Sequence, residues 1–244
     1  MKKKIASEFN SETGTLFSIP VKKKLLSKKT KYQKIEIYHS ETHGNVLMLD
    51  GCFMFTERDC HCYHDKCNEL MTRKKYFQDI LIIGGGDFGL VKKLSYRKDI
   101  RSITIIEIDK EVISSCRKFF PEFFKISQNF MKKIKIIYAD GYEWAKNNCN
   151  RKFDIIIIDS TDPVGFAKKL FTKRFFGYTF GMLNSGGIYI QQSGSPIIHY
   201  EKIIQPMIKQ LSVIGFKKIT INPFSMPSYP LGIWSFVRCQ RRSN

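Results

Sequence analysis

The sequence predicts an α/β protein in which a small β module precedes an open, doubly wound sheet. Three observations lead to this fold class. Apolar runs alternate with helical segments from Phe77 onward, a glycine-rich turn follows the first of these runs, and the residues before it have the pattern of short strands. A chain of 244 residues suits one large domain and a small second one.

The first part of the chain, residues 1–60, predicts the small β domain. Residues 32–38 alternate imperfectly between apolar and polar, and Val46–Leu49 leads into the turn Asp50-Gly51. No apolar stripe with helical spacing occurs over residues 16–49. We therefore expect strands there, followed by a Rossmann-like domain over residues 61–244.

The most informative stretch is the turn GGGDFG at residues 84–89, which follows the apolar run Ile80–Ile83. A second run, Ile103–Ile106, ends in Glu107. This layout is typical of a nucleotide-binding unit, in which the acidic residue about 20 positions after the turn binds ribose hydroxyls. Asp87 lies inside the turn, where its carboxylate repels a pyrophosphate. The expected ligand is therefore nucleoside-like and carries a cation near Asp87.

Seven apolar runs predict the strands of the large sheet. They lie at Ile80–Ile83, Ile103–Ile108, Ile134–Tyr138, Ile155–Ile158, Ile188–Gln191, Lys218–Ile221 and Ile233–Val237. The first four are almost continuously apolar, as expected of parallel strands that are covered on both faces. Helical segments lie between the runs, for example at Glu111–Phe119 and Tyr200–Leu211.

Five acidic residues follow these runs, at Asp87, Glu107, Asp140, Asp159 and Asp162. In an open α/β sheet, ligands bind at the carboxyl ends of the strands. The sequence therefore predicts an acidic crevice on a strongly basic protein. That contrast indicates a cationic ligand or substrate.

Asp159 is the strongest candidate for catalysis among these acids. It follows the four isoleucines Ile155–Ile158, so its carboxylate is expected to be partly desolvated. Desolvation raises the pKa of a carboxyl group and suits it to general-base catalysis. Two other acidic residues that follow strands have plainer structural explanations. Asp109 is expected to cap a helix that begins near Lys110, and Asp140 fits a turn.

The composition favours some functional classes over others. The net charge of +19 suggests nucleic-acid binding, but the lysines are spread along the chain, so we expect no specific nucleic-acid partner. No apolar run approaches the ~20 residues of a membrane span, and no signal-peptide core follows the basic N-terminus. We expect a cytoplasmic protein with no membrane partner. Seven cysteines, an odd number, fit reduced thiols.

A segment rich in cysteine and histidine has two interpretations. Cys60, Cys62, His64 and Cys67 could bind zinc, but their spacing is not the paired C-x-x-C of structural zinc sites. Cysteines on a partly buried helix are the preferred interpretation. No metal site is expected.

The motifs as a set resemble those of the spermidine synthases, which are polyamine aminopropyltransferases. They occur in the order and spacing of that family over nearly the whole chain. The matching pieces are Leu49-Asp50-Gly51, Thr56-Glu57-Arg58-Asp59 with Tyr63-His64, Gly84-Gly85-Gly86-Asp87, Glu107-Ile108-Asp109, Asp140-Gly141, Asp159-Ser160-Thr161-Asp162-Pro163-Val164-Gly165, Gln192 and Pro227-Ser228-Tyr229-Pro230.

The resemblance implies both a fold and a reaction. The fold is a seven-stranded, methyltransferase-like Rossmann domain that follows an N-terminal β domain. The reaction moves the aminopropyl group of decarboxylated S-adenosylmethionine to putrescine and gives spermidine and methylthioadenosine. No cofactor is expected, because decarboxylated S-adenosylmethionine is a co-substrate. A homodimer or higher homo-oligomer is expected.

The resemblance also assigns roles to individual residues. Asp159, helped by Tyr63, would take the proton of the attacking amine. The residues that would bind the donor are Met54, His64, Asp87, Glu107, Asp140 and Gly141. The residues that would bind the acceptor are Tyr63, Asp159, Asp162, Gln192 and Tyr229.

Some positions depart from the family pattern. Met54 replaces a glutamine, which is expected to weaken donor binding. Phe88 replaces a glycine, which matters only if the backbone there needs a positive φ. The sequence stops at Asn244, soon after the seventh strand, whereas many relatives continue.

Three questions stay open at the level of sequence. One alternative function is that of an amine N-methyltransferase that uses S-adenosylmethionine, and another is that of a catalytically impaired binding protein. The length of the acceptor is not fixed either. Met226 and Leu231, beside Tyr229, are candidates for setting it.

Overall fold

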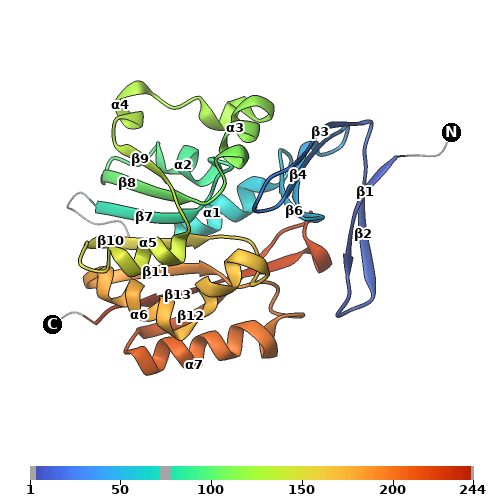
Figure 1. Cartoon of the computed structure of the whole chain (residues 1–244). Coiled ribbons are helices and arrows are strands. Elements are labelled where there is room, and N and C mark those ends of the chain that lie inside the picture. The colour runs from blue at the N-terminus through green and yellow to red at the C-terminus, as the bar shows by residue number, and fades with distance from the viewer. Residues whose placement is uncertain (1–3, 72–77, 243–244) are drawn as a thin grey trace.

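The computed structural model describes residues 4–71 and 78–242. A large sheet with helices on both faces makes up most of the molecule, and the N-terminal strands form a separate layer at one end of it (Figure 1). The predicted combination of small β sheets and a seven-stranded Rossmann-like domain is confirmed. None of the helices within the described ranges is long and apolar enough to cross a bilayer.

The N-terminal strands form two sheets. A hairpin of two strands comes first, and its first strand lies ahead of the region for which strands were predicted. A four-stranded antiparallel sheet follows in simple sequence order. The strands are β1 (Ile5–Asn10), β2 (Thr15–Pro20), β3 (Lys23–Lys29), β4 (Lys34–Ser40), β5 (Gly44–Leu49) and β6 (Cys52–Thr56).

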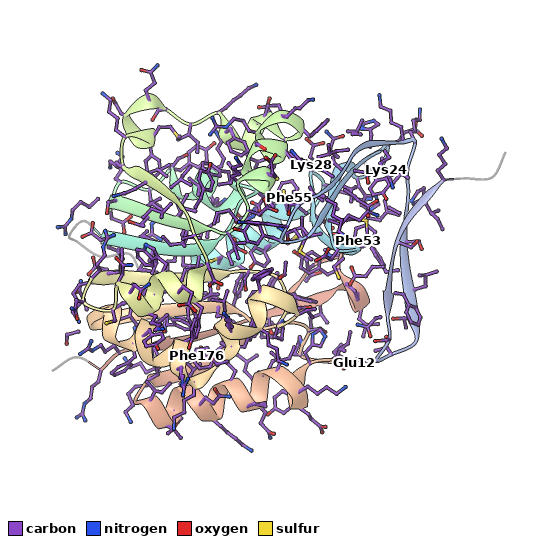
Figure 2. The ribbon with its side chains drawn as sticks, viewed as in Figure 1. Glu12, Lys24, Lys28, Phe53, Phe55 and Phe176 are labelled. Carbon is purple, nitrogen blue, oxygen red and sulfur yellow. The ribbon has the colours of Figure 1, made fainter. Side chains whose placement is uncertain are left out.

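The four-stranded sheet packs on both faces, because the side chains of β5 alternate and a bulge between β5 and β6 sends Phe53 and Phe55 to opposite faces. Val46, Met48 and Phe53 pack against Ala6 and Ile19 of the hairpin. Side chains of the opposite face, among them Leu47 and Phe55, pack against the large domain. Figure 2 shows Phe53 on the side of the hairpin and Phe55 on the other side. The small sheet is thus clamped between the hairpin and the large domain.

The large sheet has the strand order β12-β13-β11-β10-β7-β8-β9. Strand β13 is antiparallel to both of its neighbours, and the other pairs are parallel. All seven predicted strands are present. Their bounds are β7 (Gln78–Gly84), β8 (Ile100–Glu107), β9 (Ile134–Tyr138), β10 (Phe153–Asp159), β11 (Leu183–Gln192), β12 (Lys217–Ser225) and β13 (Ile233–Gln240).

The strand order reverses between β7 and β10, which are hydrogen-bonded neighbours. In their register Asp159 is the partner of Gly84. The last residue of β10 therefore lies beside the first glycine of the turn. Such a reversal point is where an open α/β sheet binds its ligand.

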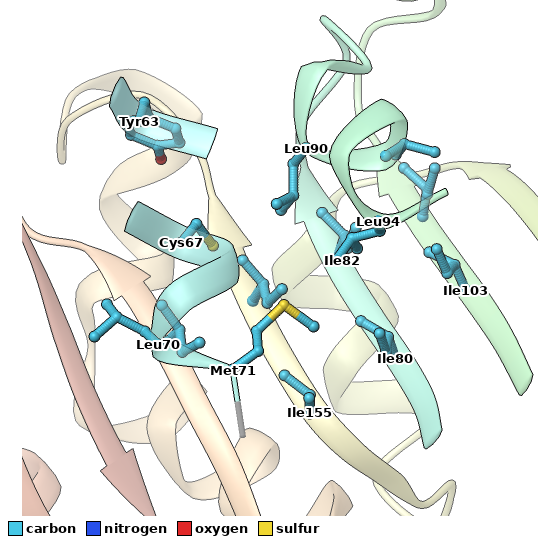
Figure 3. Close-up of a cluster of buried hydrophobic side chains, with 14 of the residues drawn as sticks. Tyr63, Cys67, Leu70, Met71, Ile80, Ile82, Leu90, Leu94, Ile103 and Ile155 are labelled. Carbon is cyan, nitrogen blue, oxygen red and sulfur yellow. The ribbon is translucent and has the colours of Figure 1, made fainter. Parts of the chain in front are cut away.

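Alternation along β7 divides the core between the two faces of the sheet. Ile80 and Ile82 face one cluster, whereas Leu81 and Ile83 face the other. Figure 3 shows Leu90 and Leu94, from one helix, next to Ile82 of β7. The helices that cover the two faces, with the short connecting helices, are α1 (Cys60–Leu70), α2 (Gly89–Leu94), α3 (Lys110–Phe119), η1 (Pro121–Phe124), α4 (Gln128–Met131), α5 (Gly141–Asn147), η2 (Gly165–Phe171), α6 (Lys173–Met182), η3 (Tyr200–Ile204), α7 (Gln205–Ile214) and η4 (Pro230–Gly232).

Two details differ from the expected pattern. Strand β9 is parallel but only half-buried, because it lies at the edge of the sheet, and Tyr138 at its end is 54% exposed. The helix expected over residues 200–211 begins with a π-helical turn, η3, before α7. The expected cap of α3 is confirmed, since the side chain of Asp109 accepts the N–H of Glu111.

Candidate active site

A cavity of about 310 Å³ lies at the carboxyl ends of β7, β8 and β10, under the edge of the small β sheet. Both domains line it. Every residue for which a role in binding or catalysis was predicted reaches its wall: Met54, Tyr63, His64, Asp87, Glu107, Asp140, Gly141, Asp159, Asp162, Gln192 and Tyr229.

Asp159 ends β10 and faces this cavity. Its Oδ1 accepts a 2.6 Å hydrogen bond from the hydroxyl of Tyr63 on α1. Its Oδ2 is buried and has no hydrogen-bond partner among the residues that the structure describes. Burial, and next the charge of Asp87, raise the pKa of Asp159 to about 6. The site therefore holds a carboxylate with one oxygen positioned by Tyr63 and one buried oxygen without a hydrogen-bond partner among the described residues.

Glycine is required at the point where β7 meets β10. Gly84 has a φ of +89°, and a Cβ there would lie 2.0 Å from the carbonyl oxygen of Asp159. The next residue, Gly85, donates its N–H to that carbonyl at 2.9 Å. The glycine turn and the end of β10 are thereby joined directly.

Asp87 and His64 face each other across the glycine turn. His64 Nε2 lies 3.4 Å from Asp87 Oδ1, which also accepts the N–H of Gly89 at 2.6 Å. Burial alone would raise the pKa of Asp87, but the hydrogen bond and charge of His64 and the N–H of Gly89 outweigh it and lower the pKa. A Cβ at Gly89 would lie 1.9 Å from the imidazole, so glycine makes room for His64.

The backbone at Phe88, where the family has a glycine, does need a positive φ. Phe88 adopts the left-handed conformation with a φ of +66°. This conformation costs an L-residue about 1–2 kcal/mol. The side chain is fully buried and stacks on Phe124 with 4.5 Å between ring centroids. Burial of a whole phenyl ring offsets the backbone strain.

Glu107 and Asp140 lie at the ends of the next two strands. Glu107 is buried and accepts the N–H of Asp109 at 2.9 Å, and burial raises the pKa of Glu107 to about 7. Asp140 caps α5, because its Oδ1 accepts the N–H groups of Tyr142 and Glu143. Asp140 is thus a helix cap and not the turn residue considered from the sequence, and it also lines the cavity.

The remaining predicted residues gather beyond Asp159. Gln192 donates from Nε2 to Asp162 Oδ1 at 3.3 Å. Tyr229 donates its hydroxyl to the carbonyl oxygen of Met54 at 2.7 Å, which ties the loop after β12 to the small sheet. Burial raises the pKa of Asp162.

Sequence reasoning missed several residues of the cavity wall. Glu8 reaches it from the hairpin, accepts the N–H of Phe53 at 2.7 Å, and has a pKa that burial raises to about 7. Tyr32 and Phe166 also line the cavity, and their rings meet edge to face at 5.4 Å between centroids. Trp234 donates from Nε1 to Gln192 Oε1 at 3.1 Å. The only available signal was alternation along β1, which would have placed Glu8 on the same face as Ala6.

The cysteine-rich segment forms α1, as expected of a partly buried helix. Cys60 and Cys67 are buried, and Cys62 is half-buried. His64 of the same helix faces Asp87. Across residues 4–71 and 78–242, no group of three or more histidine, cysteine or acidic side chains has the geometry of a metal site.

Two family models cover the chain. Residues 6–57 match the spermidine synthase tetramerisation domain, and residues 60–244 match the spermine/spermidine synthase domain. The chain belongs to the spermine/spermidine synthase family. The resemblance inferred from the motifs is thereby confirmed, and with it membership of a family of transferases of polyamine biosynthesis.

Individual relatives agree with the family models. The polyamine aminopropyltransferase of Thioalkalivibrio sulfidiphilus is 37% identical over 226 residues, which are 91% of this chain and 78% of the relative. That of Methanocaldococcus jannaschii is 37% identical over 243 residues, which are 98% and 80% of the two chains.

Solved structures of the same family have the same fold. A spermidine synthase in complex with the transition state analogue AdoDATO has a TM-score of 0.88 at 25% identity, over 100% of this chain and 83% of that one. The spermidine synthase from Thermotoga maritima has a TM-score of 0.87 at 25% identity, over 100% and 81%.

Proposed function

We propose that this family member transfers the aminopropyl group of decarboxylated S-adenosylmethionine to putrescine, with spermidine and methylthioadenosine as products. The observation that carries the proposal is Asp159, whose buried Oδ2 lacks a partner while Tyr63 holds Oδ1. A base positioned in this way, in a cavity with several acids, suits an amine that arrives as a cation and must lose a proton.

The donor half of the cavity suits a sulfonium nucleoside without a carboxylate. Asp87 would pair with the ammonium of the aminopropyl group, and its charge would repel the carboxylate of ordinary S-adenosylmethionine. Glu107 would bind the ribose hydroxyls. The edge formed by Asp140 and Gly141 would receive the adenine.

The acceptor half provides for proton removal. An alkyl amine has a pKa of about 10, so it reaches the site as an ammonium ion. Asp159 would accept the proton, with Tyr63 holding the carboxylate in place, and the nearby sulfonium would favour the neutral amine by charge repulsion. Asp162, Gln192 and Tyr229 would orient the rest of the diamine.

The transfer of the aminopropyl group then needs no reagent beyond the two substrates. The amine lone pair forms a bond to the propyl carbon, the carbon–sulfur bond breaks, and its electron pair stays on sulfur. The leaving group is a neutral thioether, methylthioadenosine. The proton on Asp159 passes to water. Because a sulfonium leaves readily, we propose that no cofactor or metal takes part, and that catalysis comes mainly from positioning and proton removal.

We also propose that the protein is a homo-oligomer that associates through its hairpin. Ile5, Phe9 and Leu16 point outward from β1 and β2 and are 54%, 65% and 61% exposed. An apolar strip of this kind on a two-stranded sheet typically marks a contact surface. The match of residues 6–57 to a tetramerisation domain supports a second copy as the partner.

The test of the enzymatic proposal is the release of methylthioadenosine from decarboxylated S-adenosylmethionine, with putrescine and then cadaverine as acceptor. Release that depends on the diamine is the expected result. Donor binding without release in any condition would contradict the proposal and favour an impaired binding protein. Tighter binding of S-adenosylmethionine in a competition titration would instead favour an N-methyltransferase.

A further inference from the structure

We propose that Trp234 is the end wall of the acceptor half of the cavity and limits the acceptor to a short diamine. The proposal rests on the proposed function, because it concerns which amine that site accepts. It assigns the acceptor limit to a residue of β13, where sequence reasoning pointed to Met226 and Leu231 in the preceding loop.

The indole of Trp234 is held firmly on the cavity wall. It is 7% exposed and contacts two rings edge to face. The ring centroid of Tyr229 lies 4.8 Å from that of the indole, with 80° between the planes, and that of His199 lies at 5.8 Å and 84°. A large, flat and buried side chain in contact with two rings has little room to turn.

A hydrogen-bond chain ties the indole to the acceptor carboxylate. Nε1 of Trp234 donates to Gln192 Oε1, and Gln192 Nε2 donates to Asp162 Oδ1. The same Gln192 oxygen accepts the N–H of Gly194 at 3.1 Å. Trp234 therefore lies next to the residues that orient the far end of the diamine.

The space behind the indole is filled. His199 and Ser195 are buried and do not line the cavity, and His199 Nδ1 accepts the N–H of Ser195 at 3.1 Å. Ser193 and Ser235 are fully buried and share a 2.8 Å hydrogen bond between their hydroxyls. Trp234 thus belongs to a solid wall, and only removal of the indole would lengthen the cavity in this direction.

The two residues proposed from sequence occupy different places. Met226 is buried and lines the cavity, so it contributes to its width. Leu231 is 47% exposed and is not part of the cavity wall. Leu231 therefore serves as a neighbouring control for Trp234.

The acidic residues in the acceptor half of the cavity suit an acceptor with a single distal ammonium group. Asp162 and Glu8 both reach the wall of the cavity. Together they can neutralise the distal amine of a diamine that Asp159 holds at its other end. The additional aminopropyl arm of a triamine would have to enter the volume of the indole. With this wall intact, spermidine leaves as a product and is not used again as an acceptor.

The experiment compares putrescine with spermidine as acceptors, at saturating donor, in the wild type and three variants. In W234A we expect the ratio of kcat/KM for spermidine to kcat/KM for putrescine to rise about tenfold or more, because pocket size limits discrimination to about this range. W234F keeps an aromatic ring in the wall but lacks the N–H and part of the indole volume, so we expect a higher KM for putrescine and a smaller rise in the ratio than in W234A. L231A is expected to leave the ratio unchanged.

An unchanged ratio in W234A would overturn the proposal, as would an equal rise in L231A. If W234A does not fold, as judged by circular dichroism, W234L provides the same comparison with a smaller loss of volume. The ratio also separates this proposal from the proposed function. Absence of methylthioadenosine release by the wild type with every amine would contradict the proposed function, whereas release with an unaltered ratio would contradict only the role of Trp234.

Discussion

At the scale of single residues, the proposed general base is the carboxylate of Asp159. We expect D159N to lower kcat by about 100- to 10,000-fold, the range for loss of a general base, with donor affinity nearly unchanged. The measurements are methylthioadenosine release and donor binding by calorimetry. D65N is the matched control, because Asp65 lies exposed on α1 and pairs with Lys93. Wild-type turnover in D159N would exclude Asp159 as the base.

The pH profile of the reaction tests the same residue. A base must be ionised, and the pKa of Asp159 is about 6, so we expect kcat/KM for putrescine to rise through that pH. The hydrogen bond from Tyr63 lowers the pKa of Asp159. Y63F should therefore shift the acid limb of the profile to higher pH. A limb that stays in place in Y63F would show that another group controls it.

Burial of the Glu107 carboxyl group in the cavity wall is expected to lower the stability of the protein as the pH rises. Burial raises its pKa from 4.5 to about 7, so the folded state favours the protonated form. The stability this provides is complete below pH 4.5 and is lost as the pH rises through 7. We expect E107Q to unfold at a higher temperature than the wild type at pH 8, with a gap that closes below pH 4.5, and to bind the donor more weakly. Calorimetry at the two pH values checks the sign.

At the scale of elements, the turn between β7 and α2 combines strain with packing. Replacement of Phe88 by glycine removes the positive-φ strain of about 1–2 kcal/mol but also deletes a buried ring, which is worth about 3–5 kcal/mol. We expect F88G to lower the free energy of unfolding by about 1–4 kcal/mol in urea denaturation. An increase in stability would mean that the stack on Phe124 contributes little.

The hairpin is the element that was predicted least completely from the sequence. Strand β1 was not predicted, although its alternation places Glu8 toward the cavity and Phe9 toward solvent. Its position depends on packing against a neighbouring sheet, and no local pattern encodes that packing. The same holds for Trp234, Tyr32 and Phe166, which meet the cavity only after loops distant in sequence come together.

The strands of the large sheet were predicted far more completely. Four consecutive isoleucines end in Asp159, and the rule that ligands bind at the carboxyl ends of strands placed that residue in the site. The rule works because parallel strands begin on one side of a sheet and end on the other. Side chains that follow different strands, such as Asp87 and Asp140, are then gathered without knowledge of the loops.

At the scale of the whole molecule, the outward face of the hairpin predicts assembly. We expect F9E to reduce the oligomer to a smaller species, because a charge in an apolar contact is left without a partner. Light scattering after gel filtration measures the mass. V213E is the matched control, since Val213 is 70% exposed on α7, far along the chain from the hairpin. Loss of mass in V213E, but not in F9E, would contradict the assignment of the interface.

The junction of Gly84 and Gly85 with the carbonyl of Asp159 has a kinetic consequence. The turn that would hold the donor and the base that would activate the acceptor are joined by one hydrogen bond, so their relative position is set before either substrate arrives. We therefore expect the steady-state parameters of both substrates to depend on this one junction. A disturbance at this junction, such as G84A, should alter the parameters of both substrates together, whereas damage elsewhere in the cavity would appear in only one.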